Sequence, residues 1–174
     1  AVANGNAGVV DRLLKSGANP NTLVNGGETV LTTAAPAGRT EAPRLRLEGG
    51  ANVNAREETR GKTALMWAAS QRHSDVVGVL LEYGADVHAR SETWSQVMAV
   101  PPHTANQQAV PHGGNTALTF AARVGDLASA RVLVNAGADV DDADERGVST
   151  TVLAAHSGFG DLVEFFLDEG ADPN

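Results

Sequence analysis

The chain has 174 residues, a formal net charge of −8 and no cysteine, which corresponds to one domain without disulfides or thiolate metal sites. Residues 126–174 carry 2 basic and 11 acidic side chains, and such an acidic end argues against nucleic-acid binding, which needs clustered Lys and Arg. It suits a basic protein partner or, more simply, a solvated acidic face. No apolar run approaches the ~18 residues that indicate a membrane span.

One dipeptide recurs in a constant context along the whole chain. Gly-Ala followed by Asn or Asp occurs at Gly17, Gly50, Gly84, Gly137 and Gly170, at intervals of 33, 34, 53 and 33 residues. A fixed period of roughly 20–50 residues indicates a protein built from stacked structural repeats. The third interval exceeds one period by about twenty residues, which predicts an insertion there.

The unit between these turns predicts two helices. Its skeleton is G-x-T-x-L-x-x-A-A-x-x-G, then a mixed segment with a Leu-Leu pair, then Gly-Ala. Thr63, like Ser149 in the last unit, precedes an apolar run and can cap a first helix. Ala68 and Ala69 favour that helix and keep it thin for close stacking. Leu80 belongs to an apolar stripe on a second helix, and Gly84 ends that helix.

This skeleton resembles the ankyrin repeat over nearly the whole chain. The resemblance implies an all-α solenoid of helix-turn-helix units with projecting β-hairpin tips and one long inserted loop. We expect a single domain, residues 1–174. It begins with a partial lead-in repeat, 1–22, which is followed by repeats over 23–55 and 56–90. The insertion, 91–113, comes next and precedes the last two repeats, 114–143 and 144–174. The family's Pro-Leu-His after the capping Thr is absent; the second unit has Ala64-Leu65-Met66, for example. The tips are therefore expected to be less well tied down.

The resemblance also bears on the source and on the ends of the chain. The segments ALMWAAS and ALTFAAR look most like bacterial members of the family, and the lack of cysteine fits a bacterial cytoplasm or periplasm equally well. The chain begins at the end of a first helix of the pattern, with Ala1-Val2-Ala3-Asn4-Gly5. We therefore expect a truncated N-terminus, and with it the loss of any targeting segment.

The first full unit departs most from the pattern. Pro36 falls at the end of its first helix and Pro43 within its second, where a proline is tolerated only if the helix begins near Ala42. Arg46 replaces the first residue of the Leu-Leu pair, and a buried unpaired arginine is costly. We expect Arg46 to point outward or its helix to be rotated, and residues 36–50 to be the least regular helical segment.

The insertion over 91–113 contains Pro101, Pro102 and Pro111, which predict an extended, irregular loop. It also contains Trp94 and several aliphatic residues, so it is not a plain flexible linker. Two alternatives are open besides disorder. The loop packs on the stack as a structural flap, or it exposes Trp94 as a binding anchor, since tryptophan is enriched at interface hot spots.

No arrangement in the sequence indicates catalysis or a cofactor. The histidines, His73, His88, His103, His112 and His156, form no pair with metal-ligand spacing, and no nucleophile elbow or phosphate-binding glycine loop is present. We therefore expect a binding protein and not an enzyme. The alternatives are a regulatory or targeting fragment of a larger enzyme or secreted effector and, least favoured, a stand-alone enzyme that uses the insertion.

The resemblance implies a protein partner bound on the concave side of the stack, through the hairpin tips, the exposed ends of the first helices and the insertion. We expect a monomer that binds neither nucleic acid nor membranes. Each position alone is also consistent with ordinary polar surface. The expected partner-binding residues are Arg56, Arg60, Lys62, Gln71, Trp94, Arg123, Asp144, Arg146 and His156.

Overall fold

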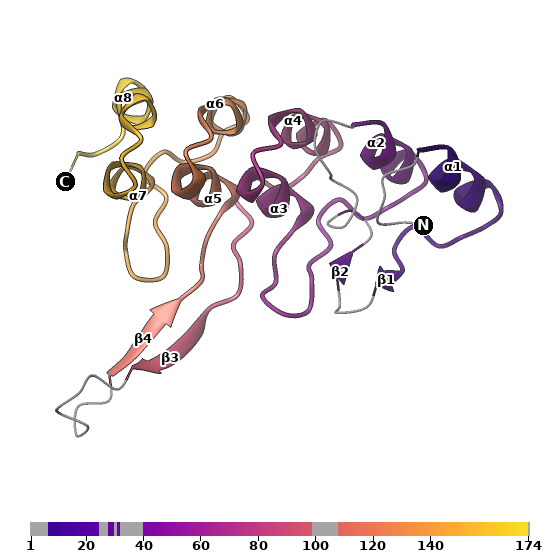
Figure 1. Ribbon diagram of the computed structural model, residues 1–174, viewed down its shortest axis with the longest axis horizontal. Coiled ribbons are helices and arrows are strands. Elements are labelled where there is room, and N and C mark those ends of the chain that lie inside the picture. The colour runs from indigo at the N-terminus through magenta and orange to yellow at the C-terminus, as the bar shows by residue number, and fades with distance from the viewer. Residues whose placement is uncertain (1–6, 25–27, 30, 32–39, 99–107, 174) are drawn as a thin grey trace.

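The computed structural model describes residues 7–24, 28–29, 31, 40–98 and 108–173. This part of the chain holds eight helices and four short strands (Figure 1). In chain order they are α1 (Ala7–Lys15), β1 (Leu23–Val24), β2 (Glu28–Thr29), α2 (Glu41–Glu48), α3 (Ala64–Ser70), α4 (Ser74–Glu82), β3 (Trp94–Met98), β4 (Gln108–His112), α5 (Ala117–Val124), α6 (Leu127–Asn135), α7 (Thr150–His156) and α8 (Gly160–Asp168).

The helices lie in two rows, as Figure 1 shows. Helices α3, α5 and α7 form a first-helix row, in which each packs on the next. Helices α1, α2, α4, α6 and α8 form a second-helix row in the same way, and α3, α5 and α7 pack on α4, α6 and α8, respectively. The molecule is therefore a mostly helical repeat fold, and its strands lie in the connections between units.

Each helix of the first-helix row begins at a hydroxyl side chain. The oxygens of Thr63, Thr116 and Ser149 accept hydrogen bonds from the backbone N–H three residues later, at 3.4, 3.3 and 3.3 Å. These bonds satisfy one of the N–H groups that the first turn of a helix leaves without an internal partner. The predicted caps at Thr63 and Ser149 are confirmed.

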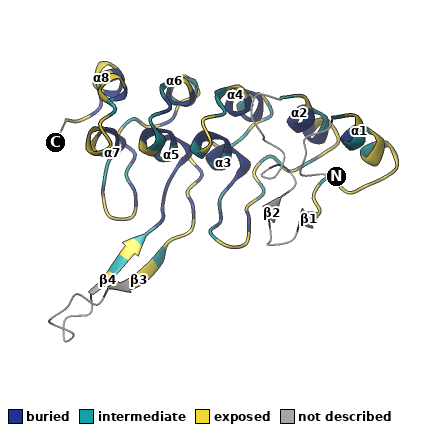
Figure 2. Cartoon of the chain, viewed as in Figure 1, coloured by how far each residue is buried: buried dark blue, intermediate teal, exposed yellow. Residues whose placement is uncertain are grey.

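The core lies between neighbouring units and between the two helices of each unit. Figure 2 shows buried residues along the surfaces where both rows of helices meet. The alanine pairs supply the contacts of the first-helix row, where Ala69, Ala122 and Ala154 are fully buried. In the second-helix row, Leu133 and Phe166 fill the corresponding positions and are also fully buried. Small side chains in one row let larger ones fill the other at native density.

Helix α2 corrects the prediction for residues 36–50. Residues 41–48 form one continuous helix, so the expected irregularity is wrong there; residues 32–39, with Pro36, lie outside the described residues. Because α2 begins at Glu41, Pro43 falls in its first turn, where its missing N–H removes no helical hydrogen bond. The sequence condition for tolerating Pro43 is therefore met.

Arg46 is buried, contrary to the expectation that it would point outward. Its exposed fraction is 1%, and it occupies the position that Leu80, Leu133 and Phe166 fill in the later units. Removal from water disfavours the charged form and lowers the pKa of the guanidinium to about 10. The helix keeps its apolar face toward the core, and the arginine is carried inside with it.

Replacing Arg46 tests the cost of this burial. We expect Arg46→Met, which keeps an unbranched stem and removes the charge, to raise the free energy of unfolding at pH 7 by about 1–2 kcal/mol. Above pH 10 the folded wild type loses the proton before the unfolded chain does, so wild-type stability rises and the gain from Arg46→Met shrinks. Urea unfolding at pH 7 and pH 10.5 measures both effects. A less stable variant at pH 7 would show that the contacts of Arg46 outweigh its desolvation.

The insertion forms a regular antiparallel ribbon in its described part. Strand β3 pairs with β4 from Trp94 opposite His112 to Met98 opposite Gln108, and the ribbon projects from the stack (Figure 1). The prediction of an irregular loop is wrong for these ten residues, because paired backbone groups satisfy each other. Pro111 is accommodated in β4 because both strands are edges, on which a missing N–H costs little. Residues 99–107 lie outside the described residues.

Candidate binding site

A carboxylate organises the inside of each of two hairpin tips, the turns that precede α3 and α7. In the tip before α3, Glu57 accepts hydrogen bonds from the backbone N–H of Thr59, Arg60 and Lys62, at 2.7, 2.8 and 3.3 Å. Burial alone would raise the pKa of Glu57, but these hydrogen bonds favour the charged form and hold it below its usual value. Glu57 therefore shapes the tip that presents Arg60 and Lys62.

Asp144, an expected partner-binding residue, has the same role in the tip before α7. It is 7% exposed and accepts hydrogen bonds from the backbone N–H of Arg146 and Val148, at 2.9 and 3.1 Å. The guanidinium of Arg146 pairs with the same carboxylate at 2.8 Å. Burial opposes the charge of Asp144, and these donors nevertheless lower its pKa. Asp144 and Arg146 thus satisfy each other within the tip.

Arginines connect successive tips. Arg56 donates to the carbonyl oxygens of Gly61, within its own tip, and of Arg90, in the next one, at 3.1 and 2.6 Å. Arg90 donates in turn to the carbonyls of Gly114 and Ala143, at 2.9 and 2.8 Å, and pairs with Asp142. Guanidinium groups therefore link successive tips in a chain whose capping Thr is not followed by the family's histidine. This also places Arg56, an expected partner-binding residue, in the framework of the tips.

The inserted hairpin, β3 and β4 with their connection, is held at its base by both neighbouring tips. The N–H of Glu92 bonds to the carbonyl of Arg60 at 2.8 Å, and the N–H of Glu145 bonds to that of Gly113 at 3.1 Å. At Gly113, which has a φ of 96°, a Cβ atom would lie 2.0 Å from the carbonyl oxygen of Glu92, so only glycine fits. The insertion is thus a lengthened third tip fixed between its neighbours.

A pocket of about 160 Å³ lies where the tip before α3, the base of the inserted hairpin and α5 meet. We call it the basic pocket, and its lining residues are Arg60, Lys62, Ser91, Trp94, Asn115, Phe120 and Arg123. Arg60, Lys62, Trp94 and Arg123 are all among the residues expected to bind a partner. Residues that are 63 positions apart in the sequence therefore line one small hollow.

The cations of the basic pocket lie against its aromatic rings. The guanidinium carbon of Arg60 is 3.8 Å from the centroid of Trp94, whose other neighbour is His112, stacked at 5.5 Å. The Lys62 Nζ and the Arg123 guanidinium carbon lie 6.0 and 5.9 Å from the centroid of Phe120. Contact with an aromatic face stabilises a cation without neutralising it.

None of the three cations forms an ion pair with a described carboxylate. Arg123 instead donates to the Oδ1 of Asn115 at 2.9 Å, a neutral acceptor that orients the guanidinium. The nearby carboxylates of Glu57 and Asp144 are engaged inside their own tips. The basic pocket therefore has positive charge that is available to an anion.

The remaining expected residues lie outside the basic pocket. Gln71 and His156 are exposed at the ends of α3 and α7, one on each side of α5 along the first-helix row. Phe120 and Ser91 were not predicted from the sequence. A signal for Phe120 was available, because the fourth residue after each capping hydroxyl is a large apolar one, and these residues remain partly exposed: Trp67, Phe120 and Leu153.

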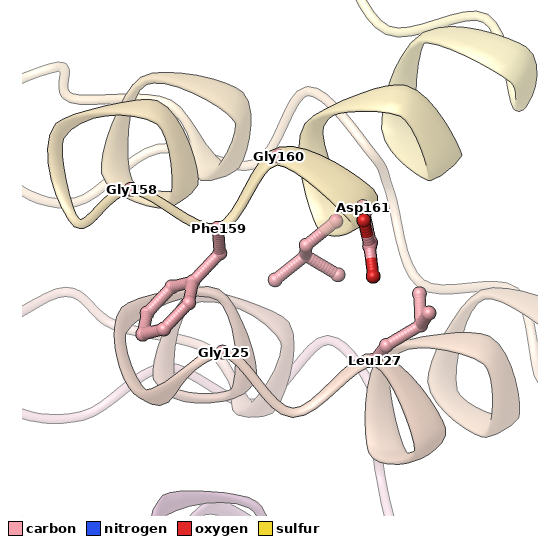
Figure 3. Close-up of a pocket in the computed structure, with 7 residues that line it drawn as sticks. Gly125, Leu127, Gly158, Phe159, Gly160 and Asp161 are labelled. Carbon is pink, nitrogen blue, oxygen red and sulfur yellow. The ribbon is translucent and has the colours of Figure 1, made fainter.

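A second hollow, of about 250 Å³, lies between the turns of the last two units (Figure 3). Its lining residues are Gly125, Leu127, Gly158, Phe159, Gly160, Asp161 and Leu162. The ring of Phe159 lies over Gly125, where a Cβ atom would be 2.5 Å from the ring. Asp161 is its one ionisable side chain. The hollow is thus the spacing left by close packing of two turns.

Over residues 7–24, 28–29, 31, 40–98 and 108–173, no group of three or more His, Asp or Glu side chains is placed to hold a metal ion. No helix in the described part of the chain is both long and apolar enough to cross a membrane.

Comparison with known proteins identifies the class that the repeated geometry defines. A family model described as ankyrin repeats (3 copies) matches residues 1–91 and 96–174, which is nearly the whole chain. The protein therefore belongs to the ankyrin-repeat family, whose members are generally protein–protein interaction modules and typically non-catalytic. A search of curated proteins found no match for it.

The internal role of Asp144 predicts a loss of stability when its charge is removed. We expect Asp144→Asn to lower the free energy of unfolding at pH 7 by about 1–2 kcal/mol, because charge-assisted bonds to Arg146 are lost. A depressed pKa contributes stability above the ordinary aspartate range, so the difference from wild type should shrink as the pH falls below about 4. Urea unfolding measures both, with Glu58→Gln, an exposed tip residue, as the control. Equal stability of Asp144→Asn and wild type at pH 7 would contradict this role.

Proposed function

We propose that the protein binds a partner protein across one face of the stack, formed by the first-helix row, the hairpin tips and the inserted hairpin. This is the concave side in the family. The observation that carries the proposal is the basic pocket, in which Arg60, Lys62, Trp94 and Arg123 converge on one hollow beside α5. The core does not require these side chains, and Arg and Trp are the residues that most often dominate interface energies.

The surface on each side of the basic pocket supports the same proposal. Trp67, Phe120 and Leu153 follow the first-helix row as a partly exposed apolar stripe, one residue in each unit. Gln71 and His156 lie exposed at the ends of α3 and α7. A stripe of apolar residues with polar side chains at its edges has the composition of an interface, a hydrophobic centre with a polar rim.

The alternatives differ in what surrounds this surface. A regulatory or targeting fragment of a larger enzyme or effector would use the same face, so it differs from the proposal only in the chain attached to it. A stand-alone enzyme is not proposed, because neither of the two hollows described above is lined by both a hydroxyl side chain and a histidine or carboxylate. We propose a monomer with a protein partner and not a nucleic acid.

Affinity capture with matched variants tests the proposal. Wild type should retain a specific protein from a lysate of its source, identified by mass spectrometry, and Trp94→Ala or Arg123→Ala should reduce its recovery about tenfold. Both side chains are outside the core, so melting temperatures should stay within a few degrees of wild type. Arg12→Ala, an exposed arginine on α1, is the charge-matched control and should retain the partner. Full capture by both pocket variants would show that the face is assigned wrongly.

A further inference from the structure

We propose that the basic pocket receives a glutamate or aspartate side chain from an acidic segment of the partner. This inference rests on the proposed function and specifies the chemistry of the bound surface. The pocket brings together three cations, Arg60, Lys62 and Arg123, without a described carboxylate in ion-pair contact with any of them. Like charges gathered in one hollow repel each other, and an anion between them relieves that repulsion.

The arrangement of the cations suits a carboxylate in particular. The guanidinium carbon of Arg60 lies 3.8 Å from the centroid of Trp94, and this cation–π contact holds the guanidinium in place. A planar guanidinium binds a carboxylate through two parallel hydrogen bonds. Arg123 is oriented by Asn115, which is buried, so this second guanidinium is also positioned before a ligand arrives. The side chains of Arg60 and Arg123 therefore lose little conformational entropy when a ligand binds.

The walls of the pocket suit the apolar stem of an acidic side chain. The rings of Trp94 and Phe120 line the same hollow as the three cations. A side chain with one or two methylene groups can place them on these rings and its carboxylate among the cations. The volume of about 160 Å³ is below the roughly 300–1,000 Å³ typical of small-molecule and cofactor sites. It is suited to one side chain of a larger partner.

The surroundings favour a short acidic segment over a nucleic acid. Exposed carboxylates lie close to the pocket: Glu58 in the tip before α3, Glu92 at the base of the inserted hairpin and Glu145 in the tip before α7. Beyond α5, residues 126–174 carry 2 basic and 11 acidic side chains. A long polyanion would be repelled by many of these carboxylates, whereas a ligand with one or two carboxylates would be repelled by fewer of them.

Nuclear magnetic resonance titration of the full chain with defined peptides tests the proposal. The probe is a capped peptide, Gly-Leu-Glu-Glu-Leu-Gly, and its matched control carries Gln-Gln in place of Glu-Glu. The indole N–H of Trp94, assigned from its loss in Trp94→Phe, and the amides of Phe120 and Arg123 should shift saturably with the Glu peptide. The Gln peptide should produce no saturable shift at these groups, and added salt should weaken binding of the Glu peptide.

Variants at the pocket assign the effect to the three cations. Arg60→Met, Lys62→Met and Arg123→Met should each weaken binding of the Glu peptide about fivefold, while keeping an apolar side chain in place. Arg12→Met, remote on α1, should bind like wild type. Thermal melting of each variant establishes that it is folded, and unchanged peptide affinity in all three pocket variants would overturn the proposal.

Other outcomes would also overturn it. These are the absence of a saturable shift up to about 10 mM Glu peptide, or equal binding of the Gln peptide. If oligothymidine bound at the same amides more tightly than the Glu peptide, the ligand would be a nucleic acid and not an acidic segment. If a phosphoserine peptide bound much more tightly than the Glu peptide, the bound group would be a phosphate and not a carboxylate. The outcome is separable from that of the proposed function. If the peptide titration fails while capture still depends on Trp94, only the proposal of an acidic side chain in the pocket is overturned, and the proposed function stands.

Discussion

Contact between neighbouring repeats is the constraint on which the rest of this molecule depends. A unit of two short helices has too little interior to bury its own apolar face, so that face must be covered by the next unit. The first-helix row comes together at alanines, with Ala69, Ala122 and Ala154 fully buried. A larger side chain at these positions would overpack the contact and push the helices apart. Small residues at these positions set the distance between units, and the distance between successive tips follows from it.

Polar bonds between tips follow from the same spacing. Asn54 donates to the carbonyl of Gly84 and accepts from the N–H of Asp86, at 3.2 and 2.8 Å, one unit away. In the next unit, His88 occupies the position of Asn54, just before the insertion. At this point in the stack, Arg90 connects the two units by donating to the carbonyl of Ala143. The stack is therefore continuous across the insertion, and the extra residues leave it as a hairpin without altering the packing of the helices.

The division of charge within the tips explains why the basic pocket is basic in an acidic protein. One carboxylate in each of these two tips faces inward, and Glu57 and Asp144 there accept hydrogen bonds from backbone N–H groups. Backbone donors lie close together in a tight turn, and an acceptor-only side chain satisfies several of them at once. The side chains of Arg60 and Lys62 have no such hydrogen bonds within the turn. Arg60 and Lys62 are left on the surface, where Arg123 of α5 joins them.

The sequence by itself determined the features that depend on short stretches of chain. The period located the helices, the hydroxyl at Thr63 and Ser149 located their starts, and the position of Pro43 set the start of α2, because caps and proline act within one turn. The sequence also selected four side chains of the basic pocket, since the period identifies positions that the core does not need.

Only the tertiary structure decided the features that depend on distant partners. Arg46 is buried because its helix keeps the orientation that the neighbouring units require, a packing effect that outweighs the preference of one residue. The insertion forms a ribbon because β3 finds β4 across residues whose prolines indicate a loop, and strand pairing is set by long-range contact. The pocket itself exists only because stacking brings Arg60 close to Arg123. A local sequence pattern cannot predict contact between residues this far apart in the chain.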